Sequence, residues 1–309
     1  MNGLVVAVVG PTATGKSELA LALARELGGE VVNADSMQLY RGMDIGTAKV
    51  PPEQRREVPH HLLDIWEVTE TASVAVYQRL ARAAVDDILA RGRVPLVVGG
   101  SGLYVRAVLD DLDFPGTDPQ IRRRLEAELA TQGPEAMHAR LAQVDPAAAA
   151  AILPSNGRRI VRALEVIELT GRPFTARLPE TPQPAYPSVR IGLDRDRDVL
   201  DERIALRVER MWRDGLVEEV RGLIPRGLRQ GRTARAALGY QQVLAYLDGV
   251  LSEAGAKAET VRATRRFARR QRSWFRRDPR VQWLDAGRPD LREAALALIQ
   301  AARPERDGG

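Results

Sequence analysis

The sequence contains no cysteine. This absence excludes disulfide bonds and thiolate metal sites, and it favours a cytoplasmic location. The sequence also has no run that is long and apolar enough to cross a bilayer, so no membrane partner is expected. The N-terminal apolar segment runs directly into a glycine-bounded loop, unlike a signal peptide. We therefore expect a cytoplasmic protein, and we expect it to be a monomer.

Lysine is nearly absent, and almost all of the cations behind the net charge of +5 are arginines. Arginine binds phosphate bidentately and stacks on flat rings, as a nucleic-acid-binding protein requires. A GC-rich genome also favours arginine codons, so composition does not separate the two explanations. The positions of the charges must decide between them.

The most informative segment is a glycine-bounded loop that ends in Gly-Lys-Ser. It consists of Gly10, Pro11, Thr12, Ala13, Thr14, Gly15, Lys16 and Ser17. An apolar run at 4–9 precedes it and a helical pattern at 18–27 follows, which is the context of a phosphate-binding P-loop. Backbone N–H groups and the helix N-terminus would face an anion. Lys16 would reach the outer phosphate and Ser17 would hold a magnesium ion, Mg²⁺, so a polyphosphate site is predicted.

Strand and helix patterns alternate through the first part of the chain. The predicted strands are 4–9, 30–34, 94–98 and 189–193, and the first predicted helices are 18–27 and 74–90. This alternation predicts an α/β fold with a P-loop NTPase-like parallel sheet flanked by helices.

A change of pattern predicts a second domain within the first. Residues 116–186 show only helical patterns and end in a proline-rich stretch, 179–187, typical of a linker. We therefore predict an α/β core at 1–115 and 187–309 with basic C-terminal helices, and a helical insertion domain at 116–186. After the last strand we expect only helices, at 197–214, 215–224, 239–248 and 257–275. The terminal residues 304–309 are expected to be disordered.

Asp35 is the second candidate site residue, because it follows the predicted strand 30–34. Ligands of open α/β sheets bind beyond the carboxyl ends of the strands. A carboxylate there can accept a proton or orient a magnesium-bound water. A lone aspartate after a strand is more often a helix cap or a surface turn. The polar residues Ser36, Gln38 and Tyr40, and the polar segment 44–49, favour a functional role here.

The strand at 94–98 lacks the acidic residue that P-loop ATPases place after a second strand. Gly99, Gly100 and Ser101 follow it instead. Two glycines suit the close approach of a bulky ligand to the backbone. The absence weakens the interpretation as a P-loop kinase or ATPase, but leaves it open because Asp35 could serve instead.

Arginines concentrate in residues 262–280. This segment contains nine arginines and one acid, Asp278, which gives a local charge of +8. Trp274 and Phe275 are interleaved with them. Clustered cations with aromatic rings are typical of nucleic-acid binding, and the alternative is a solvated basic helix whose rings pack into the core. Further arginines at 122–124 and 158–162 extend the basic path. A path of this length fits a folded RNA better than a mononucleotide.

Two of the three histidines, His60 and His61, are adjacent on a segment expected to be extended. Neighbouring side chains on such a segment point in opposite directions, so a shared metal is not expected. His138 stands alone on a predicted helix and is expected at the surface.

Together, the motifs of this chain resemble those of the bacterial tRNA dimethylallyltransferases, also called tRNA isopentenyltransferases. The resembling segments are Gly10–Ser17, Asn33–Tyr40, Gly42–Lys49, Pro59–Asp64, Gly99–Tyr104, Arg162–Val166 and Gly239-Tyr240. They run in the family's order from near residue 4 to near residue 285, and their combination is far more specific than any one alone. Gln241 and Gln242 depart from the Lys or Arg and the Glu that many members have.

The resemblance implies transfer of a dimethylallyl group from dimethylallyl diphosphate to N6 of adenosine 37 in tRNA, with release of diphosphate. It implies that Asp35 is the general base, that Ser101 lies near the reacting adenine and that Arg207 assists the leaving diphosphate. Lys16 and Ser17 match the contacts to diphosphate and magnesium. Positions that match tRNA contacts are Asp35, Ser36, Met37, Gln38, Ser101, Arg122, Arg158, Arg159, Ile160, Val161 and Arg162. From the charge pattern we add Arg265 and Arg269.

Two other classes of function remain alongside prenyl transfer. A P-loop kinase or ATPase would turn over ATP without RNA. A non-catalytic RNA-binding module would leave Lys16, Ser17 and Asp35 without a role.

Overall fold

A computed structural model of the chain describes residues 3–174 and 182–302. The chain forms two compact units: a larger one of Met1–Asp111 with Gln183–Gly309, and a smaller one of Leu112–Pro182. The expected disorder at 304–309 and part of the expected linker lie outside the described residues.

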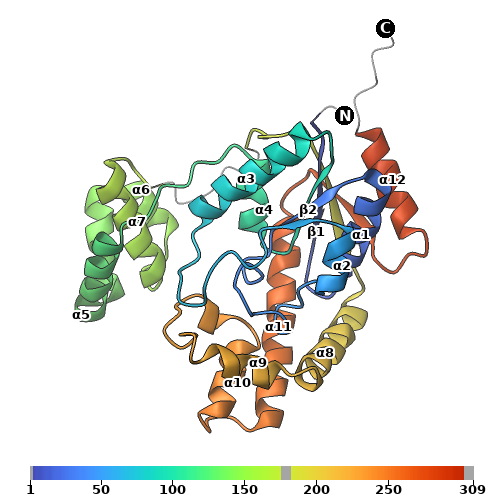
Figure 1. Cartoon of the computed structure of the whole chain (residues 1–309). Coiled ribbons are helices and arrows are strands. Elements are labelled where there is room, and N and C mark those ends of the chain that lie inside the picture. The colour runs from blue at the N-terminus through green and yellow to red at the C-terminus, as the bar shows by residue number, and fades with distance from the viewer. Residues whose placement is uncertain (1–2, 175–181, 303–309) are drawn as a thin grey trace. The chain divides into compact units, whose positions relative to one another are not determined.

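The larger unit is built on one six-stranded sheet whose order is β3-β2-β4-β1-β5-β6 (Figure 1). Its strands are β1 (Val5–Val9), β2 (Glu30–Asn33), β3 (His60–His61), β4 (Pro95–Gly99), β5 (Ser188–Asp194) and β6 (Val281–Asp285). Every neighbouring pair is parallel. The predicted α/β fold with a parallel, helix-flanked sheet is confirmed.

Apolar runs make the central strands possible, because all five residues of β1 are buried. Parallel strands need cover on both faces. On one face, α1 (Lys16–Leu27) and α12 (Leu291–Ala301) pack together over the strands, and α3 (Val74–Ala90) and α4 (Gly102–Leu109) pack together on the other (Figure 1). The carboxyl ends of β1, β2 and β4 therefore lie side by side at one edge of the sheet.

The C-terminal part of the larger unit is mostly helical. Its helices are α8 (Arg197–Arg213), α9 (Leu216–Leu223), the 3₁₀ turn η1 (Ala234–Ala236), α10 (Tyr240–Leu247) and α11 (Glu253–Phe275), while α2 (Pro52–Glu57) comes earlier in the chain. Helix α11 packs against α8, α10 and α4. It therefore connects the helical part with the sheet.

All four predicted strands and the predicted helices of the larger unit form within a few residues of their expected bounds. The expectation that only helices follow β5 is wrong, because β6 pairs with β5 in parallel register. The burial of the residues in β6, VQWLD, does not alternate clearly, and the sequence accordingly has too weak an alternation to predict a strand there. The two-residue β3 was also not predicted, since so short a strand has no periodicity.

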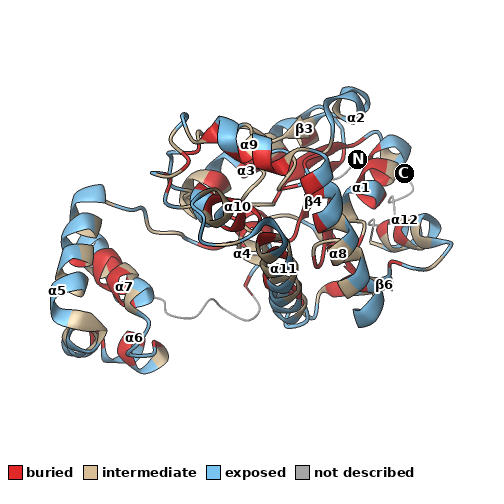
Figure 2. Ribbon diagram, turned by 90° about the horizontal axis from the view of Figure 1, so that it is seen from below, coloured by how far each residue is buried: buried red, intermediate tan, exposed pale blue. Residues whose placement is uncertain are grey.

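The smaller unit contains α5 (Pro119–Val144), α6 (Pro146–Ala151) and α7 (Gly157–Thr170). Helix α5 is interrupted at Gly133, which has a φ of 80° and is followed by Pro134. Buried residues of α5 and α7, Leu125, Met137, Leu141 and Ile160 among them, form the unit's own core. Figure 2 shows this as a buried stripe along α7. Throughout the described residues of both units, no helix combines the length and apolar character needed to span a membrane.

Candidate functional site

The P-loop joins β1 to α1 and depends on both of its glycines. Gly10 has a φ of 134°, and a Cβ there would lie 2.4 Å from the carbonyl oxygen of Leu193. Gly15 has a φ of 102° and begins α1. Ala13 is held in the left-handed region at a φ of 65°, a conformation that is strained for a residue with a side chain. The loop is thus fixed in shape at the N-terminus of α1, where anions bind.

Lys16 is half-buried beneath this loop, and its Nζ donates to the carbonyl oxygen of Pro11 at 2.6 Å. Burial lowers the pKa of Lys16 to about 7, the Asp35 carboxylate opposes that shift, and the Arg207 guanidinium adds to it. Lys16, Asp35 and Arg207 therefore share one electrostatic environment. Ser17, in the first turn of α1, is exposed.

Asp35 is oriented by a compact turn that follows β2. Its N–H donates to Oδ1 of Asn33 at 3.0 Å, and its own Oδ1 accepts the N–H of Met37 at 2.9 Å. Asn33 is fixed in turn, because its Nδ2 donates to the carbonyl oxygen of Leu62 at 3.0 Å. Oδ2 of Asp35 has no hydrogen bond to any described residue. One carboxylate oxygen thus positions the side chain and the other is available for chemistry.

Ser101 lies beside this turn because β4 neighbours β2 in the sheet. Its Oγ accepts the N–H of Ser36 at 3.2 Å and donates to Oγ of Ser36 at 3.3 Å. The residues that follow β2 and β4, 65 positions apart, are therefore brought together as the sequence analysis expects of a site at the strand ends.

Arg207 reaches the same region from α8. Its Nη2 lies 3.5 Å from the carbonyl oxygen of Thr47, which also accepts Nε2 of Gln38 at 3.1 Å. Burial lowers the pKa of Arg207, and the Asp35 carboxylate opposes that shift. Lys16 and Arg207 thus both interact electrostatically with the Asp35 carboxylate, and a bound polyanion would suit their two positive groups.

The polar segment at 44–49 is tied up in internal contacts. Nζ of buried Lys49 donates to carboxylate oxygens of Asp44 and Asp64 at 2.8 and 2.5 Å. Glu219 of α9 accepts the N–H groups of Asp44, Ile45 and Gly46 at 2.7–3.2 Å. The polarity of 44–49, which the sequence analysis used in favour of a functional role for Asp35, thus serves to hold the loop. Glu219 was not predicted, because nothing near it in sequence marks it.

The glycines after β4 accommodate the chain itself rather than a bulky ligand, which corrects the expectation for Gly99 and Gly100. A Cβ at Gly99 would lie 2.2 Å from the carbonyl oxygen of Ala34, and one at Gly100 would lie 2.2 Å from Nε2 of Gln271. A Cβ at Gly102 would lie 2.0 Å from the Trp274 ring. The backbone of Ala34 thus occupies the space beside Gly99, and side chains of α11 occupy the space beside Gly100 and Gly102.

Six of the nine arginines at 262–280 have acidic partners, of which Glu259 lies on α11 itself and Asp278 in the same segment. The pairs are Arg262 and Arg266 with Glu259, Arg265 with Asp201, Arg272 and Arg276 with Asp194, and Arg280 with Asp110 and Asp278. Arg269, Arg270 and Arg277 are exposed and pair with no acid among the described residues. Phe275 is buried as the core alternative requires, whereas Trp274 is 39% exposed. The free positive charge of α11 is therefore much smaller than the sequence count.

In the smaller unit, the predicted tRNA-contacting residues fall into two groups. Arg122 and Arg162 both pair with Glu165, whose side chain is fully buried. Ile160 and Val161 are 0% and 1% exposed and belong to the core. The expectation that these residues contact tRNA is therefore corrected for their side chains, which are buried. Arg158 and Arg159 are exposed. The outward-facing pair is the part of this group that can reach a ligand.

The histidines have structural roles. Nε2 of His61 lies 2.7 Å from Oε2 of buried Glu30, and Nδ1 of His60 lies 2.7 Å from the carbonyl oxygen of Val58. His138 is half-buried rather than at the surface, because its Nε2 lies within 3.0 Å of two carbonyl oxygens, those of Ala149 and Ile152. No cluster of three or more histidines and acids suited to a metal occurs among residues 3–174 and 182–302.

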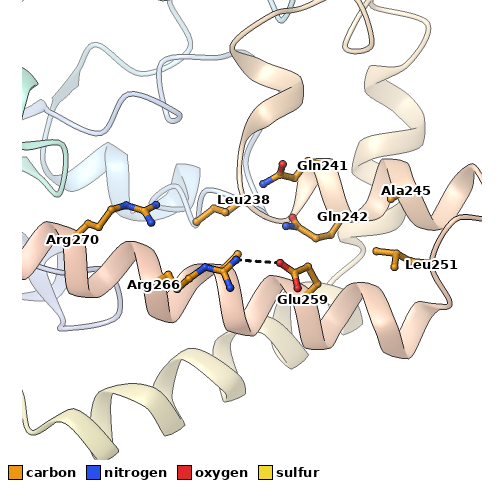
Figure 3. Close-up of a pocket in the computed structure, with 9 residues that line it drawn as sticks. Leu238, Gln241, Gln242, Ala245, Leu251, Glu259, Arg266 and Arg270 are labelled. Carbon is orange, nitrogen blue, oxygen red and sulfur yellow. Dashed lines mark hydrogen bonds and ion pairs between the residues drawn. The ribbon is translucent and has the colours of Figure 1, made fainter. Parts of the chain in front are cut away.

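A pocket of about 420 Å³ lies between α10 and α11 (Figure 3). Its lining residues are Leu238, Gln241, Gln242, Ala245, Leu251, Glu259, Ala263, Arg266 and Arg270. Figure 3 shows the Arg266–Glu259 pair along α11, on one side of the pocket. Gln242 accepts the N–H of Gly239 through Oε1 at 2.9 Å and so caps α10. The pocket is separate from the cluster at the strand ends.

Comparison with known proteins shows which family the chain resembles. A family model described as "IPP transferase" matches residues 38–278. A tRNA dimethylallyltransferase of Salinispora arenicola is 71% identical over 300 residues, which is 97% of this chain and 87% of that protein.

Solved structures give the same result. The full-length tRNA isopentenylpyrophosphate transferase of Bacillus halodurans has a TM-score of 0.71 at 42% identity, over 98% of each chain. A eukaryotic dimethylallyltransferase has a TM-score of 0.82 at 24% identity, over 99% of this chain and 82% of that one, and shares the fold. The chain therefore belongs to the IPP transferase family.

Proposed function

We propose that this protein transfers a dimethylallyl group from dimethylallyl diphosphate to N6 of adenosine 37 in tRNA. The observation that carries the proposal is the placement of the P-loop after β1 and of Asp35 after β2, two strands of one parallel sheet, in a member of the IPP transferase family. The Lys16 and Arg207 cations both interact electrostatically with the Asp35 carboxylate. A P-loop together with an aspartate that uses only one carboxylate oxygen, Oδ1, for a hydrogen bond within the described residues suits a reaction in which diphosphate leaves and an amine loses a proton.

The leaving diphosphate would be held by residues 10–17. Diphosphate departs only if its developing charge is neutralised by preorganised donors. The backbone N–H groups of the loop, the Lys16 ammonium and the Arg207 guanidinium supply that charge. Because the pKa of Lys16 is about 7, this lysine is only partly charged near neutral pH, and a bound anion would favour its charged form.

Asp35 would accept the proton that the adenine N6 loses as the new C–N bond forms. An exocyclic amine is a weak nucleophile, so a positioned carboxylate accelerates its reaction. Oδ2 carries this role because Oδ1 is engaged by the N–H of Met37. Ser101, bonded to Ser36 at the same edge, would contact the adenine, which must leave its stack to reach the site.

The donor set fits a magnesium ion that the substrate itself helps to bind. Mg²⁺ keeps several waters and needs only one or two protein ligands beside phosphate oxygens. The exposed Ser17 hydroxyl at the start of α1 is the ligand proposed here. When bound, the ion would neutralise charge on the diphosphate.

The tRNA contacts are proposed from exposure and charge. Ser36, Met37 and Gln38 are half-buried beside Asp35, and Arg158, Arg159 and Arg269 are exposed cations. Arg122, Arg162 and Arg265 remain proposed contacts through whatever hydrogen-bonding capacity their ion pairs leave. A tRNA substrate would place the protein in the cytoplasm, and the proposed catalytic residues all lie on one chain, as a monomer requires.

One assay tests the proposal. The protein is incubated with labelled dimethylallyl diphosphate or ATP, with and without tRNA. Transfer of label to tRNA supports prenyl transfer, whereas RNA-independent phosphate release from ATP, or no turnover at all, would refute it. Asp35→Asn should lower the turnover about 10²- to 10⁴-fold while leaving tRNA affinity nearly unchanged. The exposed Asp111, changed to Asn, is the matched control.

A further inference from the structure

One buried glutamine of α11 joins the two halves of the proposed site. Gln271 is 5% exposed. Its Oε1 accepts the N–H of Thr12 in the P-loop at 2.9 Å, and its Nε2 donates to the carbonyl oxygen of Gly100 at 2.9 Å. Both ends of one rigid amide group are therefore used, each on a different loop.

These two loops carry different substrates in the proposed reaction. Thr12 belongs to the loop that would hold the diphosphate, and Gly100 directly precedes Ser101, which would contact the adenine. The strands before them, β1 and β4, are neighbours in the sheet. The sheet fixes where the strands end, and the Gln271 amide fixes how far apart the two loops lie beyond those ends.

We propose that Gln271 is a positioning residue that sets the distance between the donor loop and the acceptor turn. The proposal rests on the proposed function. Reaction between two bound groups depends steeply on their alignment, and a misplacement of about 1 Å can lower a rate about 100-fold. Loss of Gln271 should therefore act on kcat, with little change in the KM of either substrate.

Two further contacts indicate that the chain folds without the Gln271 amide. Nε of Arg203 donates to the carbonyl oxygen of Ala13 at 2.9 Å, so α8 still holds the P-loop. Trp274 still packs against Gly102. Each loop then keeps one attachment of its own, and only the connection between them is lost.

Gln242 provides a matched control. It is also 5% exposed, also lies on a helix and also accepts a backbone N–H at 2.9 Å, from Gly239. Its bond caps α10 and touches neither loop. Gln→Met preserves side-chain length and removes both hydrogen-bonding ends of the amide, so Gln271→Met loses two buried hydrogen bonds and Gln242→Met loses one.

The experiment compares Gln271→Met with Gln242→Met in the full chain. We expect Gln271→Met to lower kcat about 10- to 100-fold, with KM for dimethylallyl diphosphate and tRNA within about threefold of the parent. Gln242→Met, which also loses a buried hydrogen bond, should lower the unfolding temperature and leave kcat unchanged. Equal kcat in the two variants, or a loss confined to KM, would overturn the proposal.

A second readout does not depend on turnover. Amide hydrogen exchange should increase in segments 10–17 and 99–104 of Gln271→Met and in neither segment of Gln242→Met. Gln271→Glu keeps the acceptor for Thr12 but loses the donor for Gly100, so it should increase exchange mainly in 99–104. If the parent protein transfers no prenyl group, the proposed function fails. In that case, unchanged amide exchange in segments 10–17 and 99–104 of Gln271→Met would also rule out Gln271 as the link between the two loops.

Discussion

Helix α11 and the helices of the smaller unit are both rich in arginine, but they differ in the source of their counter-ions. In the smaller unit, Arg122 and Arg162 converge on one buried carboxylate, that of Glu165. On α11 the acids are spread over several elements, such as Asp201 on α8, and Arg269 remains without an acidic partner among the described residues. Arginine pairs with one buried acid in the smaller unit and with dispersed acids around α11, and exposed arginines remain in both regions.

Glu165→Gln should produce the largest effect that separates the two regions. Breaking a buried ion pair by removing one partner destabilises a protein by about 3–5 kcal/mol, because buried charges are left uncompensated. Asp201→Asn should change the free energy of unfolding by less than about 1 kcal/mol, because the Asp201 side chain is 24% exposed. Urea denaturation followed by circular dichroism measures both. Equal losses would mean that Glu165 is no more integral than a surface acid.

Arg269→Ala and Arg265→Ala test whether an unpaired arginine of α11 contributes more to RNA affinity than a paired one. Removing one phosphate contact should weaken tRNA binding and reduce the slope of log K against log salt by about 1. We expect this for Arg269→Ala, and a smaller change for Arg265→Ala, whose Nη2 donates to the carbonyl oxygen of Asp201 at 3.0 Å. Filter binding over a salt series gives both slopes. The reverse ranking would show that ion pairing does not keep Arg265 from RNA.

The same logic applies to Arg158→Ala and Arg162→Ala in the smaller unit. Arg158 is exposed, whereas Arg162 donates to Glu165 at 2.6 Å and to the carbonyl oxygen of Pro115 at 2.6 Å. We expect Arg158→Ala to lower tRNA affinity without changing stability. Arg162→Ala should mainly lower the unfolding temperature. A stability loss in Arg158→Ala alone would contradict the division into outward and inward arginines.

The smallest effect that we expect to separate the two regions is a loss of stability at acid pH. Burial raises the pKa of Glu165, but hydrogen bonds from Arg122, Thr117 and Arg162 outweigh it and leave that pKa below its ordinary value. A carboxyl with a lowered pKa stabilises the fold above its ordinary pKa, and this stabilisation is lost as pH falls toward the lowered value. Denaturation between about pH 5 and 3 should therefore show a loss in the parent that is reduced in Glu165→Gln. An identical pH dependence in both would argue against this linkage.

Local patterns were sufficient to predict the P-loop, the parallel sheet and the position of Asp35, because each depends on neighbours in sequence. Partners distant in sequence were not predictable in this way. Glu219, Gln271 and Glu165 carry no local signal, and their roles follow from what the fold brings to them. The glycines at 99 and 100 were predicted as special for the wrong reason, since space beside a glycine does not reveal whether a ligand or a side chain fills it.

The bond between Thr12 and Gln271 spans 259 residues, so its two partners are synthesised far apart in time. At ordinary translation rates of about 5–20 residues per second, Gln271 is synthesised on the order of 10 to 50 seconds after Thr12. A nascent chain therefore contains the anion-binding loop long before that loop has its final support. Chains cut short before α11 would keep the P-loop sequence but lack the tether that aligns it with the turn after β4.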